Sequence, residues 1–201
     1  PAAVTHGASR KRLFLEVDMI LIIDFGSQFN QLIARRVRES QVYCQIEPPS
    51  ITCDQVRSLA PEGIILSGGP SSIYEPQSPK IDPAILELGV PVLGICYGLQ
   101  YMVHALEGAV ARSRKREYGF AEFRVVKEDA LFKGIETHTP CWMSHGDSIT
   151  QLPAGFRVTG STENTPVAAA SNPRRKLYGL QFHPEVEHTP RGKTMLRNFL
   201  N

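Results

Sequence analysis

The ten residues PVLGICYGLQ, from Pro91 to Gln100, change from the pattern of a buried strand to that of a helix at one cysteine, Cys96. The apolar run VPVLGI before the cysteine is typical of a parallel strand that is covered on both faces. After it, apolar residues recur at helical spacing, at Leu99, Met102, Val103 and Leu106. A strand that leads directly into a helix is the unit from which α/β sheets are built.

The same alternation of strand and helix runs through the first half of the chain. The runs MILIID, VYCQIE and GIILS predict strands, and the segments between them predict helices, the first with Ser27 as its N-cap. Short connections between such elements predict an open, mostly parallel central sheet with helices on both faces. The runs AEFRVV, GFRVTG, PVAAAS and KLYGLQF predict a small antiparallel or mixed extension, followed by a helix from about Arg191 to Leu200. The predicted fold class is therefore α/β.

The composition predicts one globular domain. The 201 residues are 42% hydrophobic and 21% charged, and the net charge of +2 gives no reason to expect binding to nucleic acid or to a membrane surface. The four cysteines show no CxxC spacing, which argues against a disulfide framework or structural zinc and favours the cytoplasm. Residues 1–18 lack periodicity, so we expect a flexible leader, an alternative start or a cloning remnant there, and the domain at residues 19–201.

Glycines flank the cysteine two positions away on either side, at Gly94 and Gly98. This arrangement has the form of a nucleophile elbow in which cysteine stands where hydrolases carry serine. Small neighbours allow the chain to reverse sharply from strand into helix, which lifts the sulfur of Cys96 clear of the sheet. The positive end of the following helix favours the thiolate. A buried structural cysteine is the alternative interpretation of the same residues.

A cysteine nucleophile needs a base and a group that orients the base. In GLQFHPEV, His183 lies at the end of a predicted strand, and Glu185 follows two residues later, on the same side of an extended chain. In WMSHGD, His145 and Asp147 have the same spacing and form the alternative pair. We prefer His183 because its strand-end position matches that of Cys96.

The third element is the glycine pair in ILSGGP, at the end of another predicted strand. Backbone N–H groups in such a turn can form a small anion-binding concavity. We expect the amides of Gly69 and Tyr97 to form an oxyanion hole. The segment lacks the patterns of dinucleotide or P-loop phosphate binding.

The motifs GICYGLQ, SGGP and FHPEV resemble those of the triad-type, class I glutamine amidotransferases. The stretches DFGSQFNQLIARRVRE, ILSGGPSSIY, REYGFAE, WMSHGD and QFHPEVEHT resemble the GMP synthetase branch of that family. The resemblance covers essentially residues 19–200 and implies a flavodoxin-like fold. It implies Cys96 as nucleophile, His183 as acid and base, and Glu185 as the group that orients His183. It also implies a glutamine-contacting loop, which His145 helps to position; the implied glutamine contacts are Gln100, Ser144, Gly146 and Asp147.

The resemblance implies hydrolysis of L-glutamine, through a cysteine thioester, to glutamate and ammonia. The ammonia would pass to an ATP-pyrophosphatase (synthetase) domain, in the same full-length chain or on a separate protein, which aminates xanthosine monophosphate to GMP. No cofactor or metal is expected in the amidotransferase domain, whereas ATP and Mg²⁺ are expected on the synthetase domain. Two alternatives remain open: a cysteine hydrolase of the same fold that acts on γ-glutamyl or peptide bonds, and a regulatory module without turnover.

Overall fold

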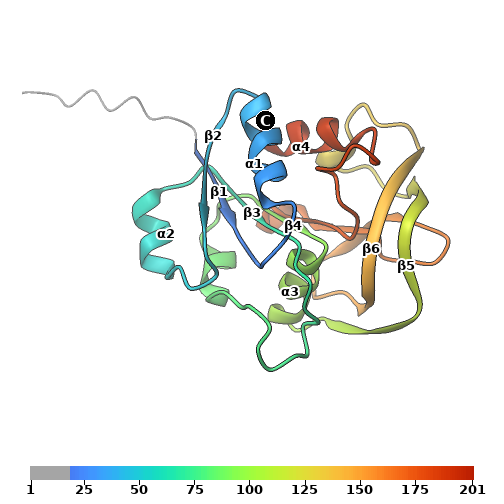
Figure 1. Ribbon diagram of the computed structural model, residues 1–201, viewed down its shortest axis with the longest axis horizontal. Helices are drawn as coiled ribbons and strands as arrows, with labels where there is room; N and C mark the ends of the chain where they lie inside the picture. Colours follow the sequence, from blue (N-terminus) through green and yellow to red (C-terminus); the bar gives the residue numbers. More distant parts are fainter. Residues whose placement is uncertain (1–18) are drawn as a thin grey trace, which may run out of the picture.

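The structure is a computed structural model that describes residues 19–201, apart from the side chains of residues 114 and 115 (Figure 1). The predicted leader at residues 1–18 lies outside the described residues. In chain order, the elements are β1 (Met19–Ile23), α1 (Asn30–Glu39), β2 (Tyr43–Glu47), α2 (Cys53–Leu59), β3 (Gly63–Leu66), η1 (Pro83–Glu87), β4 (Val92–Ile95), α3 (Tyr97–Ala105), β5 (Ala109–Val125), η2 (Ala130–Phe132), β6 (His138–Gln151), β7 (Arg157–Ser161), β8 (Ala169–Asn172), η3 (Pro173–Arg175), β9 (Leu177–Leu180) and α4 (Gly192–Leu200).

The nine strands of residues 19–201 form one sheet in the order β2-β1-β3-β4-β9-β8-β7-β5-β6. The first five strands of this order are parallel, and antiparallel pairing begins between β9 and β8. The predicted α/β class, a parallel sheet with an antiparallel extension, is therefore confirmed. The run KLYGLQF was expected in the extension, but it forms β9, which pairs in parallel with β4. The extension includes β6, a strand of 14 residues that the sequence patterns did not predict. It pairs along most of its length with β5, which has 17 residues (Figure 1).

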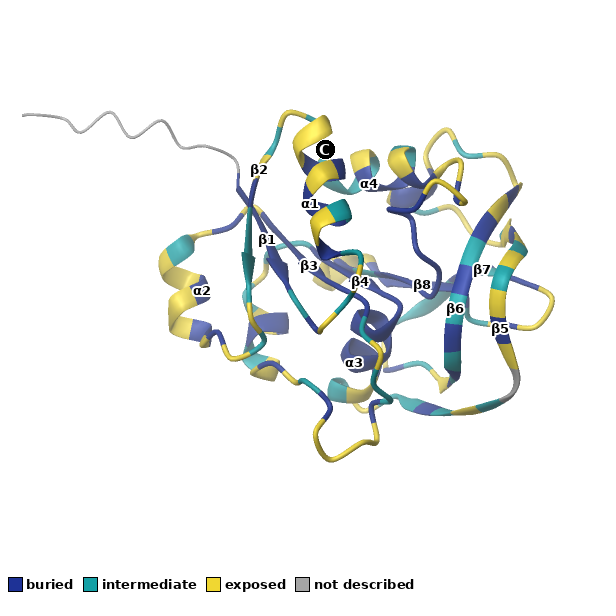
Figure 2. Ribbon diagram, in the orientation of Figure 1, coloured by how far each residue is buried: buried dark blue, intermediate teal, exposed yellow. Residues whose placement is uncertain are grey.

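Helices cover both faces of the parallel strands, because alternate residues of each strand point to opposite sides. In β1, Leu21 belongs to the apolar layer that contains Leu99 of α3, whereas Ile22 belongs to the layer that contains Ile33 of α1 and Met195 of α4. Each of these side chains is at most 1% exposed, so each stabilises the fold by about 1.5–3 kcal/mol. Figure 2 shows the buried inner faces of the helices against the sheet.

The helix starts differ in how they are capped. We expected Ser27 to cap α1, but the N-cap is Phe29, which makes no side-chain cap bond. Ser27 instead accepts a hydrogen bond at 3.0 Å from the Phe29 N–H, which forms a tight turn before the helix. Helix α2 has a full capping box between Thr52 and Gln55. Among residues 19–201, no helix combines the length and the apolar character needed to cross a bilayer.

The fold brings three strand ends together at one edge of the sheet. Strand β4 lies between β3 and β9, all three in parallel register, with Leu66 beside Gly94 and Ile95 beside Leu180. In parallel sheets, ligands bind at the carboxyl ends of the strands. Gly69 follows β3, Cys96 follows β4 and His183 follows β9. These are residues that the sequence analysis predicts to take part in catalysis.

Candidate active site

Cys96 lies in the sharp turn between β4 and α3, in a strained backbone conformation. Its φ of 51° and ψ of −107° place a non-glycine residue in a region that costs about 1–3 kcal/mol. Two hydrogen bonds fix the turn: the Cys96 N–H donates to the Leu180 carbonyl at 2.7 Å, and the Gln100 N–H donates to the Cys96 carbonyl at 3.1 Å. The predicted elbow is therefore present. Such strain is typical of functional positions.

The flanking glycines are sterically required. A Cβ on Gly98 would lie 2.3 Å from the carbonyl oxygen of Leu66, and a Cβ on Gly94 would lie 2.7 Å from the backbone nitrogen of Leu99. Both contacts are with backbone atoms, so no side-chain movement can relieve them. Gly98 is required by the close passage of α3 over β3, and Gly94 by the close approach of the start of α3 to β4.

His183 lies three residues beyond the end of β9, the strand next to β4. Its backbone is fixed on both sides, because its N–H donates to the Trp142 carbonyl at 3.1 Å and its carbonyl accepts from Thr189 Oγ1 at 2.7 Å. Nδ1 of the ring lies 2.7 Å from Glu185 Oε1, and the Glu185 side chain is fully buried. Arg36 of α1 donates from Nε to the Glu185 carbonyl at 3.0 Å. The histidine and its carboxylate therefore form a rigid unit.

The pairing of His183 with Glu185 was predicted for an incorrect reason. Extended backbone was expected to place the two side chains on one side, but Pro184 and Glu185 lie in a turn. That turn brings the carboxylate back to the imidazole nitrogen. The spacing of two residues is therefore met by a local loop instead of a strand.

The charges around His183 favour its protonated form. Burial alone lowers the pKa of His183, but the Glu185 carboxylate and the sulfur of Cys96 beside the ring raise it to about 10. The ring therefore carries a proton at neutral pH. This places a proton donor beside the sulfur.

Cys96 and His183 line the same cavity, of about 260 Å³, together with Ser27, Gly69 and Ser144. A Cβ on Gly68 would lie 3.0 Å from Cε1 of His183 and 3.7 Å from Cβ of Cys96. The glycine after β3 thus leaves room for the ring and the sulfur to approach each other.

The two amides expected to form an oxyanion hole lie at neighbouring strand ends. Tyr97 is the first residue of α3, where the amide N–H has no partner within the helix. Gly69 lines the cavities on both sides of Cys96. A Cβ on Gly69 would lie 2.6 Å from the Phe25 carbonyl, so the turn after β3 admits only glycine there.

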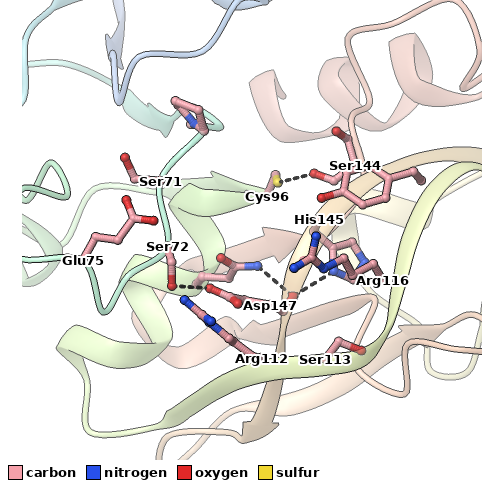
Figure 3. A pocket seen from close by; sticks show the side chains of 15 residues that line it. Ser71, Ser72, Glu75, Cys96, Arg112, Ser113, Arg116, Ser144, His145 and Asp147 are labelled. Atoms are coloured by element: carbon pink, nitrogen blue, oxygen red, sulfur yellow. Dashed lines mark hydrogen bonds between the residues drawn. The ribbon is translucent and has the colours of Figure 1, made fainter.

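A second cavity, of about 510 Å³, opens on the other side of Cys96 and contains all four expected glutamine contacts (Figure 3). Gln100 donates from Nε2 to the Asp147 carbonyl and to Gln181 Oε1, both at 3.1 Å. The sulfur of Cys96 lies 3.6 Å from the Ser144 carbonyl. Residues 144–147 were expected in a loop, but they belong to β6, so the expectation of a loop was wrong.

The sequence did not indicate several other residues of this cavity. Ser72 donates to Asp147 Oδ2 at 2.5 Å, and Glu75, Arg112 and Arg116 add charged side chains to the wall. The residues come from the loop after β3 and from β5. Only the Ser/Pro-rich composition after the glycine pair could have indicated a loop there, and it says nothing about the arginines.

His145, the alternative base, has both ring nitrogens engaged elsewhere. Nδ1 lies 2.8 Å from the Asp147 carbonyl, and Nε2 lies 3.3 Å from Thr165 Oγ1 and 3.7 Å from Glu117 Oε2. Burial lowers the pKa of His145, although the Asp147 carbonyl and the Glu117 charge oppose this. The position of His145 is more consistent with a structural role in the cavity wall than with proton transfer at Cys96.

Among the described residues, no cluster of three or more His, Cys, Asp or Glu side chains could hold a metal ion. All four cysteines are free and buried. The site therefore consists of one thiol, one imidazole–carboxylate pair, backbone amides and two adjoining cavities. This set of groups fits acyl transfer to sulfur.

A thiol on a strained elbow shares a cavity with an imidazole–carboxylate pair that follows the neighbouring strand of an α/β sheet. Acyl transfer to a cysteine requires groups of this kind. The family model of class-I glutamine amidotransferases matches residues 21–201. The chain therefore belongs to the class-I glutamine amidotransferase family.

Among its relatives is a GMP synthase [glutamine-hydrolyzing] of Heliobacterium modesticaldum, 53% identical over 183 residues, which are 91% of this chain and 36% of the relative. The corresponding protein of Natranaerobius thermophilus is 51% identical over the same share. This chain spans about a third of the length of these relatives.

Solved structures give the same fold. A putative GMP synthase subunit from Thermoplasma acidophilum has a TM-score of 0.81 and 29% identity, over 90% of this chain and 92% of that one. A glutamine amidotransferase from Thermotoga maritima has a TM-score of 0.69 at 21% identity, over 85% and 77% of the two chains, which shows a likeness of fold alone.

Proposed function

We propose that this chain is the glutaminase part of a GMP synthase and that Cys96 is its nucleophile. One observation carries the proposal: the sulfur on the strained elbow shares a cavity with His183, whose ring Glu185 holds at 2.7 Å. A nucleophile, an acid–base group and an orienting carboxylate on adjacent strand ends are the parts that acyl transfer from an amide requires.

In the first half of the reaction, the thiolate of Cys96 attacks the side-chain carbonyl carbon of glutamine. The new oxyanion accepts hydrogen bonds from the amides of Gly69 and Tyr97. The imidazolium of His183 then gives its proton to the amide nitrogen, the C–N bond breaks, and ammonia leaves. A γ-glutamyl thioester on Cys96 remains.

In the second half, water replaces ammonia. The neutral ring of His183 takes a proton from water, and the oxygen attacks the thioester carbon. The C–S bond breaks, glutamate leaves, and the thiolate and imidazolium are restored. Glu185 holds His183 Nδ1 at 2.7 Å and keeps the other ring nitrogen directed at the sulfur. These steps invoke no metal or organic cofactor in this domain.

The larger cavity would hold the amino-acid part of the substrate. Gln100, Ser144, Gly146 and Asp147 line it, and the Asp147 carboxylate supplies a negative charge suited to the α-amino group. Because Ser72 already donates to Asp147 Oδ2, the carboxylate is held in one orientation before substrate arrives. Preorganised polar groups of this kind fix the orientation of a ligand.

The partner that we propose is an ATP-pyrophosphatase (synthetase) domain, in the same full-length chain or on a separate protein. Relatives named GMP synthase [glutamine-hydrolyzing] are almost three times as long as the stretch they share with this chain, which supports such a partner. That domain would bind ATP, Mg²⁺ and xanthosine monophosphate and use the ammonia to form GMP. The free cysteines support a reducing compartment, and we place the activity in the cytoplasm.

The test is a glutaminase assay in the presence of the synthetase partner. We expect Cys96→Ala to release no glutamate above background, whereas Cys53→Ala, a matched change at another buried free cysteine, keeps the activity of the folded protein. Full activity in Cys96→Ala would refute the proposal. Faster hydrolysis of γ-glutamyl peptides than of glutamine by the wild type would favour a different cysteine hydrolase.

A further inference from the structure

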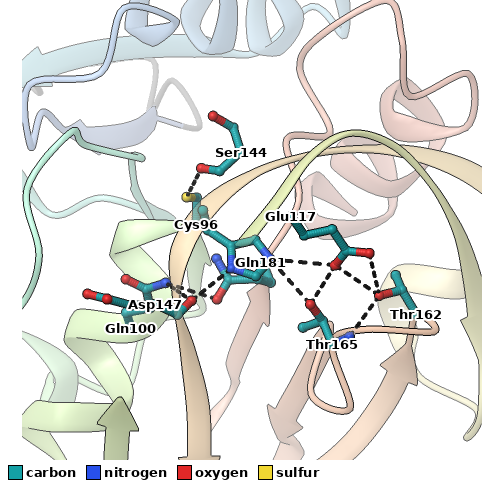
Figure 4. Close-up of polar contacts among 9 residues, drawn as sticks. Cys96, Gln100, Glu117, Ser144, Asp147, Thr162, Thr165 and Gln181 are labelled. Atoms are coloured by element: carbon teal, nitrogen blue, oxygen red, sulfur yellow. Dashed lines mark hydrogen bonds and ion pairs between the residues drawn. The ribbon is translucent and has the colours of Figure 1, made fainter. Parts of the chain in front are cut away.

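Glu117 is a buried carboxylate that the proposed reaction does not use. It lies in β5 and is only 8% exposed. Its oxygens accept hydrogen bonds from Thr162 Oγ1 at 3.1 and 3.2 Å and from Thr165 Oγ1 at 2.6 Å (Figure 4). Burial of an ionised carboxylate is costly unless it is paired and hydrogen-bonded. Glu117 lies behind His145, which lines the proposed substrate cavity, and its burial there calls for a function.

The position of Glu117 coincides with a break in the pairing of β5 and β6. Arg112 lies opposite Asp147 and Glu117 lies opposite His145, so residues 113–116 of β5 bulge opposite Gly146 alone. A bulge interrupts the ladder of backbone hydrogen bonds. The β6 segment that faces the cavity therefore needs anchors other than ordinary strand pairing.

The side chain of His145 supplies one such anchor. Because the Asp147 carbonyl can only accept, His145 Nδ1 is the donor in their 2.8 Å contact. Gln100 donates to the same carbonyl at 3.1 Å, so two side chains fix the backbone at Asp147. The other nitrogen of His145 faces Thr165 Oγ1 at 3.3 Å and Glu117 Oε2 at 3.7 Å.

We propose that Glu117 is a positioning residue that acts through His145 to hold residues 144–147 in the geometry that binds glutamine. The carboxylate accepts the hydroxyl protons of Thr162 and Thr165 and so fixes these side chains. Thr165 then packs against the Nε2 edge of the imidazole at 3.3 Å and limits its rotation. The ring in turn fixes the Asp147 carbonyl. This inference rests on the proposed function, because it concerns the binding of the same substrate.

Two probes separate this effect from a change in the nucleophile. A glutamine-derived diazoketone must occupy the cavity before it alkylates Cys96, so its half-saturation concentration reports on the geometry of residues 144–147. Iodoacetamide has no glutamine backbone and reports on the reactivity of the sulfur. In the 201-residue chain, we expect Glu117→Gln to raise the diazoketone half-saturation concentration about tenfold, the size expected for loss of one hydrogen bond to a charged group. The iodoacetamide rate at Cys96 should stay within about twofold of the wild type, because the elbow is untouched.

The route through His145 is tested by substitution at that position. His145→Asn keeps a donor near the place of Nδ1 and should bind the diazoketone better than His145→Leu, which has none. If Glu117 acts through His145, Glu117→Gln should add little in the His145→Leu background, because the two changes break one chain of contacts. Additive losses would overturn the proposed route.

The chain provides a matched control on the same two strands. Glu122 of β5 contacts His138 of β6 at 2.9 Å, but both side chains are exposed and neither lines the cavity beside Cys96. Glu122→Gln should leave both probes unchanged. If Glu117→Gln does not fold, Thr165→Val removes the hydroxyl between Glu117 and His145 and should raise the half-saturation concentration in the same way.

The outcomes separate the inference from the proposed function. Absence of saturable diazoketone labelling in the wild-type protein refutes both. Saturable labelling of wild type with an unchanged half-saturation concentration in Glu117→Gln and Thr165→Val refutes the inference alone. An equal decrease in the rates at which the diazoketone and iodoacetamide alkylate Cys96 in these variants also refutes the inference, because the substitution would then have changed the conformation of the elbow.

Discussion

The substitution Gly98→Ala tests whether steric constraint at the elbow positions the nucleophile. In an unconstrained helix, alanine would stabilise the chain by about 1 kcal/mol relative to glycine. Here the added Cβ would lie 2.3 Å from the carbonyl oxygen of Leu66, whereas real Cβ contacts essentially never fall below 3.0 Å. The start of α3 must therefore move by at least about 0.7 Å.

Both stability and activity should fall as a result. Overpacking costs about 1–3 kcal/mol, and contact with backbone atoms places this site at the upper end, about 2–3 kcal/mol. After the gain of about 1 kcal/mol in helix propensity, we expect a net loss of roughly 1–2 kcal/mol. For a domain of this size, the melting temperature should fall by roughly 2–8 °C. A shift approaching 1 Å at Cys96 should lower kcat by about 10- to 100-fold.

The assays are thermal unfolding and glutaminase activity with the synthetase partner, the latter at a temperature where all variants are folded. Gly134→Ala is the control, because its φ of +73° costs about 1–2 kcal/mol with alanine, yet its Cβ would meet nothing within 4 Å. It should lower the melting temperature to a similar degree and leave kcat unchanged. A Gly98→Ala protein that melts no lower than wild type and keeps its kcat would refute the steric argument.

Three further predictions concern the triad histidine, the other cysteines and a helix cap. Glu185→Gln should lower kcat at least about 100-fold with little change in KM. Because the pKa of His183 is raised from 6.5 to about 10, its protonation contributes its full stability below pH 6.5, and this stability is lost as pH rises through 10. The difference in unfolding free energy between wild type and Glu185→Gln should therefore shrink between these two pH values. Burial raises the pKa of Cys141 to about 12, so peptide mapping after iodoacetamide at pH 8 should find Cys141 unmodified; modification there before Cys96 would contradict this. Thr52→Ala should cost about 1 kcal/mol in chemical denaturation, through loss of the α2 capping box, without change in glutaminase activity.

The elbow could be predicted from sequence because its cause is local. Two glycines around Cys96 and a change from strand to helix periodicity lie within ten residues, and the structure places the turn where they indicate. The strand-end position of His183 was also a local signal, since it follows an apolar run. The pairing of the two strands was not predicted, because the run KLYGLQF before His183 was expected in the antiparallel or mixed extension. The structure instead pairs β9 with β4 in parallel, which brings Cys96 and His183 to one edge of the sheet.

The contacts that shape the substrate cavity had no local signature. Strand β6 contains a proline, a glycine and several polar residues, which obscures its alternation of buried and exposed side chains. The bulge in β5 becomes visible only when the two strands are paired. The hydrogen bond from Ser72 to Asp147 spans 75 positions of the sequence, and the one from Thr165 to Glu117 spans 48. Patterns of residue spacing within one helix or strand cannot predict contacts at such separations.

The most direct measurement of the central claim is mass spectrometry of the protein after treatment with glutamine itself, quenched in acid during turnover with the synthetase partner. We expect one γ-glutamyl thioester, on the peptide that contains Cys96. A thioester on another cysteine, or glutamate release with no modification of Cys96 under any condition of turnover, would contradict it.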